Sequence, residues 1–391
     1  MSSALHRMHV RPWGRGREVG HSDSLAALPA FDFTLPDALA AHEPPEMRGL
    51  ARDAVRLLVS HGDRQITHAR FRSLPRFLAR GDVLVVNTSA TINAAFRARR
   101  CGGPGRCDEQ VAVHLSTPLP DGRWVIEMRR PTAHGSDPLL DARAGERLLL
   151  PAVATATLIE PYAPTGHSAP HADRVRLWIA SITTSNGVMP LAERYGEPIR
   201  YAYVPRRWPL AYYQTMFAAE PGSAEMPSAG RPFTHAILET LSQNGVRIVP
   251  IVLHTGVSSL ESDEPPYPER FRVPAATADA VNEAHATRRR VVAVGTTAVR
   301  AIETMATPAG IVSPGEGWTN LTISPERGVF AVDALLTGFH PPHTSHLALL
   351  EALAGTPTIA HAYATALRHR YLWHEFGDSH LVAFRTCGND G

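Results

Sequence analysis

The stretch Val291-Val292-Ala293-Val294-Gly295-Thr296-Thr297-Ala298-Val299-Arg300 joins a short apolar run to a helix-forming run through a glycine turn. Four consecutive apolar residues, 291–294, are typical of a strand that is buried on both faces. The following residues predict a turn at 295–297 and a helix from about residue 298 to residue 305. A strand, a turn and a helix in this order indicate one unit of an α/β fold with parallel strands.

The same pattern recurs on both sides of this stretch. A helix is predicted over 232–244, stopped by Gly245, and a strand over 246–253. A second helix over 278–287 precedes the strand at 291–294. Further along the chain, a strand over 330–336 leads through a loop to a helix over 344–354. The second half of the chain is therefore predicted to be an α/β domain.

The first half of the chain has a different pattern, in which every predicted element is a strand. Short apolar or alternating runs separated by turns occupy 83–87, 111–115, 124–128, 148–150 and 175–179. Strands at this spacing predict a small antiparallel barrel or sandwich. Residues 1–28, which are rich in glycine, arginine and serine, are expected to form a flexible arm.

The composition excludes several chemistries. All 39 basic residues of the 391-residue chain are arginine, so no lysine is present to form a Schiff base, anchor pyridoxal phosphate or complete a P-loop. The net charge of +2 argues against binding nucleic acid through overall charge, although it leaves room for a local arginine patch.

The cysteines and the apolar runs bear on where the protein works. Three cysteines are too few for a disulfide framework, which favours a reducing compartment. Cys101 and Cys107, even with His114 nearby, do not have the spacing of a zinc site, so no metal is expected. We find neither a transmembrane run nor a secretory signal in the sequence, and we expect a cytoplasmic protein with no membrane partner.

Polar residues at three predicted strand ends are candidates for a site. They are His254-Thr255-Gly256, Gly295-Thr296-Thr297 and Thr337-Gly338-Phe339-His340. Ligands of α/β folds bind at the carboxyl ends of the strands. The glycine-threonine-threonine turn offers backbone N–H groups and hydroxyls to a carboxylate, and Arg300 would add a planar fork. Under the competing interpretation, Thr297 only caps the helix, the histidines are structural, and Asp378 is a turn acid.

These segments belong to a longer series of motifs, which runs in order along the chain. The series includes Gly81-Asp82-Val83-Leu84-Val85-Val86-Asn87, Tyr213-Gln214-Thr215, Pro221-Gly222-Ser223-Ala224, Pro227-Ser228-Ala229-Gly230 and Phe376-Gly377-Asp378, together with the three strand ends. In order and spacing the series resembles the S-adenosylmethionine:tRNA ribosyltransferase-isomerases of queuosine biosynthesis. The resemblance spans roughly residues 31–384.

The resemblance implies a fold and a reaction. The fold would be a barrel-like α/β main domain, 29–66 and 185–391, which carries the active site, with a small antiparallel β-barrel inserted at 67–184. In the reaction, the ribosyl part of S-adenosylmethionine is transferred to a 7-aminomethyl-7-deazaguanine base in tRNA. It is then isomerised to an epoxycyclopentane, with release of adenine and methionine. S-adenosylmethionine acts as a substrate, and no metal is required.

The resemblance also implies the site residues. The candidate catalytic residues are His254, His340, Glu269 and Asp378, and either histidine could serve as the base that removes a hydrogen next to the sulfonium. The candidate S-adenosylmethionine-binding residues are Gly256, Gly295, Thr296, Thr297, Arg300, Ser228, Ala229, Gly230, Thr337 and Phe339.

The chain departs from the family pattern at several positions. Arg231-Pro232-Phe233 replaces leucine-histidine-phenylalanine, and Val257-Ser258-Ser259-Leu260 replaces a glycine-threonine-phenylalanine run. Tyr267 replaces a histidine, Gly338 an asparagine, and Ala90 and Ala95 basic residues. These departures concern the expected acceptor side, so three functions stay open: the family reaction on tRNA, a relative that uses a small-molecule acceptor or acts as a lyase, and a non-catalytic RNA-binding relative.

Overall fold

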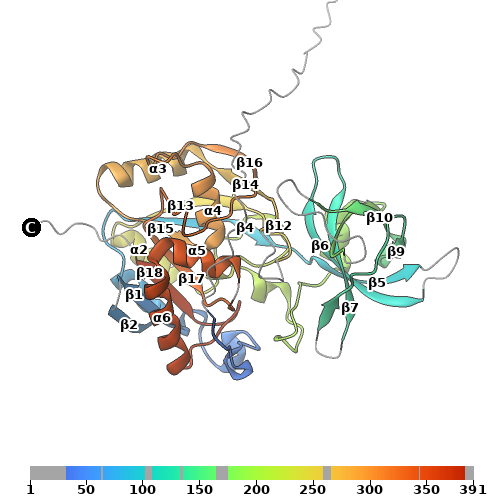
Figure 1. Ribbon diagram of the computed structural model, residues 1–391, viewed down its shortest axis with the longest axis horizontal. Coiled ribbons are helices and arrows are strands. Elements are labelled where there is room, and N and C mark those ends of the chain that lie inside the picture. Colours follow the sequence, from blue (N-terminus) through green and yellow to red (C-terminus); the bar gives the residue numbers. More distant parts are fainter. Residues whose placement is uncertain are drawn as a thin grey trace, which may run out of the picture.

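The computed structural model describes residues 32–62, 65–101, 108–132, 135–163, 175–258, 266–342 and 344–383. Within these ranges the chain forms a larger α/β body and a smaller β body beside it (Figure 1). The predicted arm at 1–28 lies outside the described residues.

The α/β body is built on a mixed nine-stranded sheet with the order β16-β14-β13-β3-β15-β17-β18-β1-β2. The neighbours β13, β3, β15 and β17 are parallel, whereas β14 and β16 add antiparallel strands at one edge. At the other side, β18 is antiparallel to β17 and parallel to β1, and β2 is antiparallel to β1. In chain order these strands are β1 (Arg56–His61), β2 (Gln65–Arg70), β3 (Val83–Asn87), β13 (Arg247–Leu253), β14 (Glu269–Val273), β15 (Val291–Val294), β16 (Gly315–Thr319), β17 (Ala334–Gly338) and β18 (Ser379–Ala383).

The central strands are buried on both faces. Along β3, Val83 and Val85 pack into one hydrophobic core, and Leu84 and Val86 pack into another. Such double burial explains why these strands have continuous apolar sequences instead of alternating ones. The parallel strands β13, β15 and β17 confirm the α/β class predicted for the second half of the chain, whereas β3 joins this sheet from the first half, where an antiparallel barrel or sandwich was predicted.

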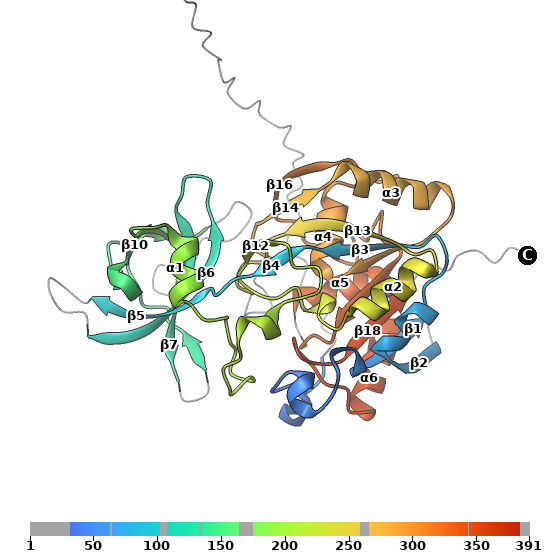
Figure 2. The same cartoon turned by 180° about the vertical axis from the view of Figure 1, so that it is seen from behind.

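Helices cover this sheet. They are α2 (His235–Gln243), α3 (Ala275–Ala286), α4 (Thr296–Thr304), α5 (Ser345–Ala354) and α6 (Thr356–Arg368) (Figure 1). The helix α1 (Val188–Tyr195) lies beside the β body (Figure 2). The predicted helices are present, with ends shifted by up to three residues. The helix α6, which follows α5 directly after Gly355, was not predicted from the sequence. Short 3-10 helices occupy Asp37–Leu39, Pro45–Arg48, Arg52–Ala54, Phe71–Arg76, Pro151–Val153, Leu210–Tyr213 and Ser228–Gly230.

The β body is a closed antiparallel barrel, as predicted. Its strands follow the order β11-β10-β9-β5-β6-β7, and a further pairing of β11 with β7 closes the ring. They are β5 (Ala95–Cys101), β6 (Glu109–Pro118), β7 (Trp124–Pro131), β9 (Arg147–Leu149), β10 (Thr155–Pro161) and β11 (Leu177–Thr183), with β8 (Ser136–Pro138) added beside β7. Cys101 is disulfide-bonded, which the cysteine count did not predict.

The insertion starts later than the predicted residue 67. The strands β2 and β3 belong to the nine-stranded sheet, where β3 pairs in parallel with β13 and β15. The short strand β4 (Ser89–Thr91) pairs with β12 (Glu220–Ser223) in a separate two-stranded sheet. The barrel therefore begins at β5, and Figure 2 shows β3, β4 and β5 running one after another from the α/β body into it.

The chain enters and leaves the barrel at one place, which we call the neck. Here the backbones of Ala95 and Glu197 exchange two hydrogen bonds of 2.8 Å. The barrel also contacts the α/β body directly, because the Ser116 hydroxyl accepts a hydrogen bond from the Val257 N–H at 3.1 Å. Helices long and apolar enough to cross a membrane are absent from the described ranges.

Candidate active site

A cavity of about 620 Å³ opens where the central strands of the α/β body end. Its wall includes residues that follow β13, β15 and β17, as expected for ligand sites of α/β folds. Most of the predicted site residues line it: Ser228, Ala229, Gly256, Glu269, Gly295, Thr296, Thr297, Arg300, Thr337, Phe339 and His340. The cavity lining does not include His254, Gly230 and Asp378.

Asn87, at the end of β3, holds two of the strand ends together. Its amide nitrogen donates to the Leu253 carbonyl at 2.8 Å and to the Thr297 hydroxyl at 3.3 Å. Its amide oxygen accepts from the backbone N–H groups of Leu253 and Ser89, both at 3.0 Å. In the sequence Asn87 is only the last residue of a motif, and the structure gives it this positioning role.

The glycine-threonine-threonine turn leads into α4. Gly295 has a φ of +86°, a left-handed conformation that glycine adopts at little cost, and its N–H donates to the Leu336 carbonyl at 2.8 Å. The first turn of a helix leaves N–H groups without intrahelical partners. Because Thr296 and Thr297 line the cavity at this point, the turn is suited to a carboxylate or another anion.

Arg300 and Glu269 form an ion pair in the cavity wall. The Arg300 guanidinium also donates to the carbonyls of Leu321 at 3.1 Å and Thr319 at 3.2 Å. The other Glu269 oxygen accepts from the Gly256 N–H at 3.0 Å. Both side chains are thus occupied by the protein itself. This arrangement indicates that both side chains hold the cavity wall in position. It does not favour the predicted roles, which were substrate binding by Arg300 and catalysis by Glu269.

His254 lies outside the cavity lining. Its Nδ1 is 2.8 Å from the Ser89 hydroxyl, and its Nε2 is 3.5 Å from a Glu220 carboxylate oxygen. Its ring packs against Gly222, where an added Cβ would lie 2.4 Å from Nδ1. Burial lowers the pKa of His254, so the imidazole is neutral at pH 7.

His340 is part of the cavity wall. Its Nε2 lies 2.9 Å from the Thr337 hydroxyl, and its ring stacks on His346 with a centroid distance of 4.7 Å. Burial, together with the nearby imidazoles, lowers the pKa of His340 well below its ordinary value. A neutral imidazole at this position has the form that a general base requires.

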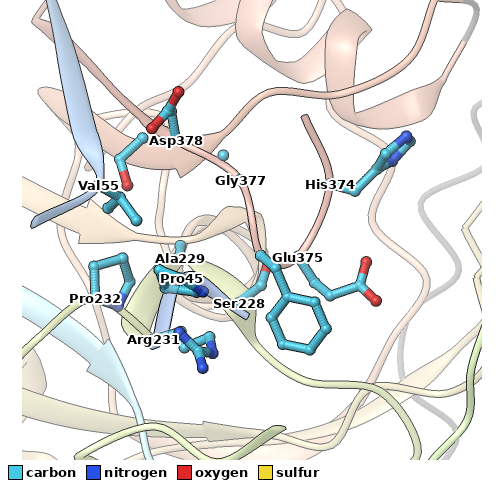
Figure 3. Close-up of a pocket in the computed structure, with 13 residues that line it drawn as sticks. Pro45, Val55, Ser228, Ala229, Arg231, Pro232, His374, Glu375, Gly377 and Asp378 are labelled. Carbon is cyan, nitrogen blue, oxygen red and sulfur yellow. The ribbon is translucent and has the colours of Figure 1, made fainter. Parts of the chain in front are cut away.

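Asp378 has the structural role of a turn acid. One carboxylate oxygen accepts from the Arg56 N–H at 2.7 Å, and the other accepts from the Leu372 N–H at 2.8 Å and from Arg56 Nε at 3.1 Å. It borders a separate small pocket, in which the Asp378 and Glu375 side chains point in different directions (Figure 3). The structure therefore favours the structural interpretation of Asp378 over the predicted catalytic one.

Gly230 supports the cavity wall from behind. An added Cβ at Gly230 would lie 3.3 Å from the Phe217 ring and 3.4 Å from the Thr215 side chain. The close packing holds the neighbouring Ser228 and Ala229 in the lining.

Two glutamates in the cavity wall were not among the predicted site residues. Glu225 accepts hydrogen bonds from the Tyr201 hydroxyl and from Ser258, and Glu375 accepts one from the Tyr203 hydroxyl at 2.6 Å. The available signal was their position, since Glu225 lies between two quoted motifs and Glu375 directly precedes another. They lie 150 positions apart in the sequence, and only the fold brings them to one cavity.

The described residues contain no group of three or more histidine, cysteine, aspartate or glutamate side chains arranged to hold a metal ion. The cavity combines aromatic and aliphatic side chains with a few polar groups, a lining that suits an organic ligand.

Comparison with known proteins gives matches along almost the whole chain. Residues 28–382 match a family model described as "Queuosine biosynthesis protein". A protein from Moorella thermoacetica named S-adenosylmethionine:tRNA ribosyltransferase-isomerase is 34% identical over 363 residues, which cover 90% of this chain and 98% of the relative. A protein of the same name from Symbiobacterium thermophilum is 35% identical over 369 residues, which cover 91% and 99%. A solved structure of an S-adenosylmethionine tRNA ribosyltransferase from Thermotoga maritima is 28% identical, with a TM-score of 0.47 and coverage of 90% of this chain and 99% of that chain.

Proposed function

The chain belongs to the family of queuosine biosynthesis proteins, and we propose from this premise that it is an S-adenosylmethionine-dependent ribosyltransferase-isomerase. It transfers the ribosyl part of S-adenosylmethionine to a 7-aminomethyl-7-deazaguanine base in tRNA, isomerises it, and releases adenine and methionine. The observation that carries this function is the match to relatives of that name over about 90% of the chain. The small-molecule acceptor and the non-catalytic relative are not favoured by these matches. Because tRNA is the acceptor, we place the enzyme in the cytoplasm.

We propose that S-adenosylmethionine binds along the strand ends in the 620 Å³ cavity. The first turn of α4, at Thr296 and Thr297, would hold the carboxylate of its methionine part. The other lining residues of the predicted set, Gly256, Gly295, Ser228, Ala229, Thr337 and Phe339, would contact the rest of the molecule. Arg300 and Glu269 keep the Gly256 backbone in place.

We propose His340 as the base that removes a hydrogen next to the sulfonium. A positive sulfur makes the hydrogens on the adjacent carbon acidic, so that a neutral imidazole is a sufficient acceptor. His340 lines the cavity, and its hydrogen bond to Thr337 and its stacking on His346 fix its ring. His254 lies outside the lining. Its hydrogen bond to Ser89 would hold the end of β13 in position next to β4, so we assign it a positioning role.

The test of the proposed function is incubation with S-adenosylmethionine and tRNA that bears 7-aminomethyl-7-deazaguanine. Active enzyme should release adenine and increase the mass of the tRNA, and neither should occur when the tRNA bears guanine instead. If the folded protein releases no adenine with this tRNA, the proposed function is wrong.

The role of His340 is tested with His340→Gln. We expect kcat to fall by about a hundredfold or more, because a positioned base contributes about 10²–10⁴ to the rate. The Kd for S-adenosylmethionine, measured by calorimetry, should change little. The matched control is His361→Gln, at an exposed position on α6, which should keep full activity. An unchanged kcat in His340→Gln would assign the base elsewhere.

A further inference from the structure

One side of the cavity combines two carboxyl groups with two tyrosines. We call Tyr201, Tyr203, Glu225 and Glu375 the acidic wall. The two tyrosine rings stack with centroids 5.9 Å apart and 22° between their planes, and Tyr203 stacks in turn on His374 at 3.9 Å. Each tyrosine hydroxyl donates to one of the carboxylates. All four residues line the same cavity.

The two carboxyl groups differ in how many partners the protein gives them. Glu225 receives hydrogen bonds from Tyr201, from the Ser258 N–H and from the Ser258 hydroxyl, so both of its oxygens are engaged. Glu375 receives one side-chain hydrogen bond, at Oε2 from Tyr203, and its own backbone N–H is the other donor that acts on the carboxyl. A carboxylate has about four acceptor positions, so Glu375 has acceptor positions left for a ligand that donates N–H groups.

Arg231 offsets the charge of Glu375 only in part, because its guanidinium is engaged by other groups. Arg231, which borders the same small pocket as Glu375, donates to the Glu46 carboxylate at 2.9 Å and to the Tyr212 carbonyl at 2.8 Å. Burial raises the pKa of Glu375 to about 7, and the charge of Glu225 adds to the increase. A cation in the cavity beside the wall would lower the free energy of both carboxylates.

The chemistry of the wall selects among the cationic groups of the two substrates. The α-ammonium of the methionine part is bonded to the same carbon as a carboxylate. The two carboxylates of the acidic wall would repel that carboxylate, so the wall does not suit the methionine part. The sulfonium has no N–H to donate to Glu375. The aminomethyl group of the deazaguanine acceptor is an isolated primary ammonium with three donors.

We propose that the acidic wall binds the primary ammonium of the acceptor base, with Glu375 as its principal hydrogen-bond acceptor. The proposal rests on the proposed function, because that function supplies an aminomethyl acceptor. It makes Glu375 a residue that selects the acceptor, separate from the residues that bind S-adenosylmethionine.

The test compares two anticodon stem-loop RNAs that differ only in the amine. One carries 7-aminomethyl-7-deazaguanine and the other 7-methyl-7-deazaguanine, and Kd is measured by calorimetry. We expect the protein to bind the amine-bearing RNA about tenfold more tightly, the size typical of a hydrogen bond to a charged group. Glu375→Gln, which keeps the shape and an acceptor for Tyr203 but removes the charge, should abolish this preference.

Three further measurements separate a binding role from a structural one. Glu375→Asp should retain part of the preference, and Glu375→Gln should keep its Kd for S-adenosylmethionine. The same exchange at an exposed carboxylate of α3, Glu283→Gln, should leave the preference intact. Adenine release is measured on the same preparations.

The possible outcomes distinguish this proposal from the proposed function. If the protein releases adenine but shows no preference for the amine, or if the preference survives in Glu375→Gln, the acidic wall has a different role and the proposal is wrong. If Glu375→Gln abolishes a clear preference while the protein releases no adenine, the ammonium site stands and the proposed reaction fails.

Discussion

Several charged side chains of the sequence motifs form their hydrogen bonds and ion pairs with other groups of the protein. Asp378 binds two backbone N–H groups and Arg56, and Arg300 binds Glu269 and backbone carbonyls. A motif shows that a residue type is present at a position, but not whether its atoms are free. The catalytic role predicted for Asp378 is not favoured by the structure for this reason, because its hydrogen-bond partners come from residues 56 and 372.

Asp378→Ala should destabilise the protein. The change leaves the N–H groups of Arg56 and Leu372 without their acceptor, so we expect the free energy of unfolding to fall by about 3 kcal/mol. Urea denaturation measures it. Asp121→Ala, in an exposed turn, is the control and should cause no measurable loss. A full loss of activity without a loss of stability would restore the catalytic interpretation of Asp378.

His285 makes part of the stability dependent on pH. Asp333, 3.7 Å from Nε2, raises the pKa of His285 above its ordinary value against the opposing effect of burial. The ring nitrogens also face the carbonyls of Gly310 at 3.2 Å and Ala331 at 3.1 Å. A raised pKa means that the stabilisation is complete below the unfolded value of about 6.5 and is lost as pH rises through the folded value.

His285→Gln should therefore be less stable than the natural protein at pH 6, and the difference should shrink at pH 8.5. Urea denaturation at the two pH values measures both. An equal difference at the two values would show that charge on His285 does not contribute.

At the scale of elements, the barrel contains a buried charged cluster between its strands. Glu127 of β7 accepts from Arg129 at 2.7 Å and from Arg176 at 3.1 Å, and His114 of β6 lies 3.6 Å away. Burial opposes ionisation of Glu127, but these three groups outweigh it and lower its pKa to about 2. The Glu127 carboxylate thus compensates the positive charges of two arginines that would otherwise be buried in the barrel without a counter-charge.

Glu127→Gln should weaken the barrel more than the α/β body. Removal of one partner leaves buried positive charge, a change that costs about 3–5 kcal/mol in known cases. Hydrogen exchange should accelerate in β6, β7 and β11 while the central strands β3 and β15 stay protected. Uniform acceleration across both bodies would contradict a barrel-specific effect.

The elements predictable from sequence were those with local signals. The helix α2 ends before Gly245, whose φ is +79°, and β15 is one apolar run followed by Gly295. The position of β3 was not predictable in this way, because its membership in the larger sheet depends on parallel pairing with β13, more than 150 residues further along the chain. The acidic wall escaped prediction for the same reason, since Glu225 and Glu375 meet only in the folded chain.

At the scale of the whole molecule, the barrel reaches the cavity through a few contacts. Ser116 touches the loop that follows β13, where a Cβ on Gly256 would lie 2.6 Å from its hydroxyl. The rings of Tyr162 in the barrel and Tyr267 in the cavity wall lie 5.7 Å apart. A movement of the barrel at the neck would therefore change one side of the cavity.

Gly196→Ala tests this coupling. An added Cβ at Gly196 would lie 2.2 Å from the Asn93 carbonyl oxygen, so the two chain segments of the neck must separate. We expect kcat/KM for tRNA to fall by about tenfold or more, since small displacements of positioned groups have large effects on rate. The Kd for S-adenosylmethionine should change less. Gly317→Ala, whose Cβ would meet only the Phe271 ring at 3.9 Å, is the matched control. Equal activity of the two variants would show that the placement of the barrel is unimportant.

The neck also makes the protein modular. Because Ala95 and Glu197 face each other across two backbone hydrogen bonds, the incoming and outgoing chains end side by side. A linker of about three residues, each spanning about 3.3–3.6 Å when extended, would reconnect the α/β body after excision of the barrel. The barrel is thus a replaceable insertion. A gene for this protein could lose it, exchange it for the barrel of a relative, or receive another small domain at the same two positions. None of these changes would interrupt a strand of the nine-stranded sheet.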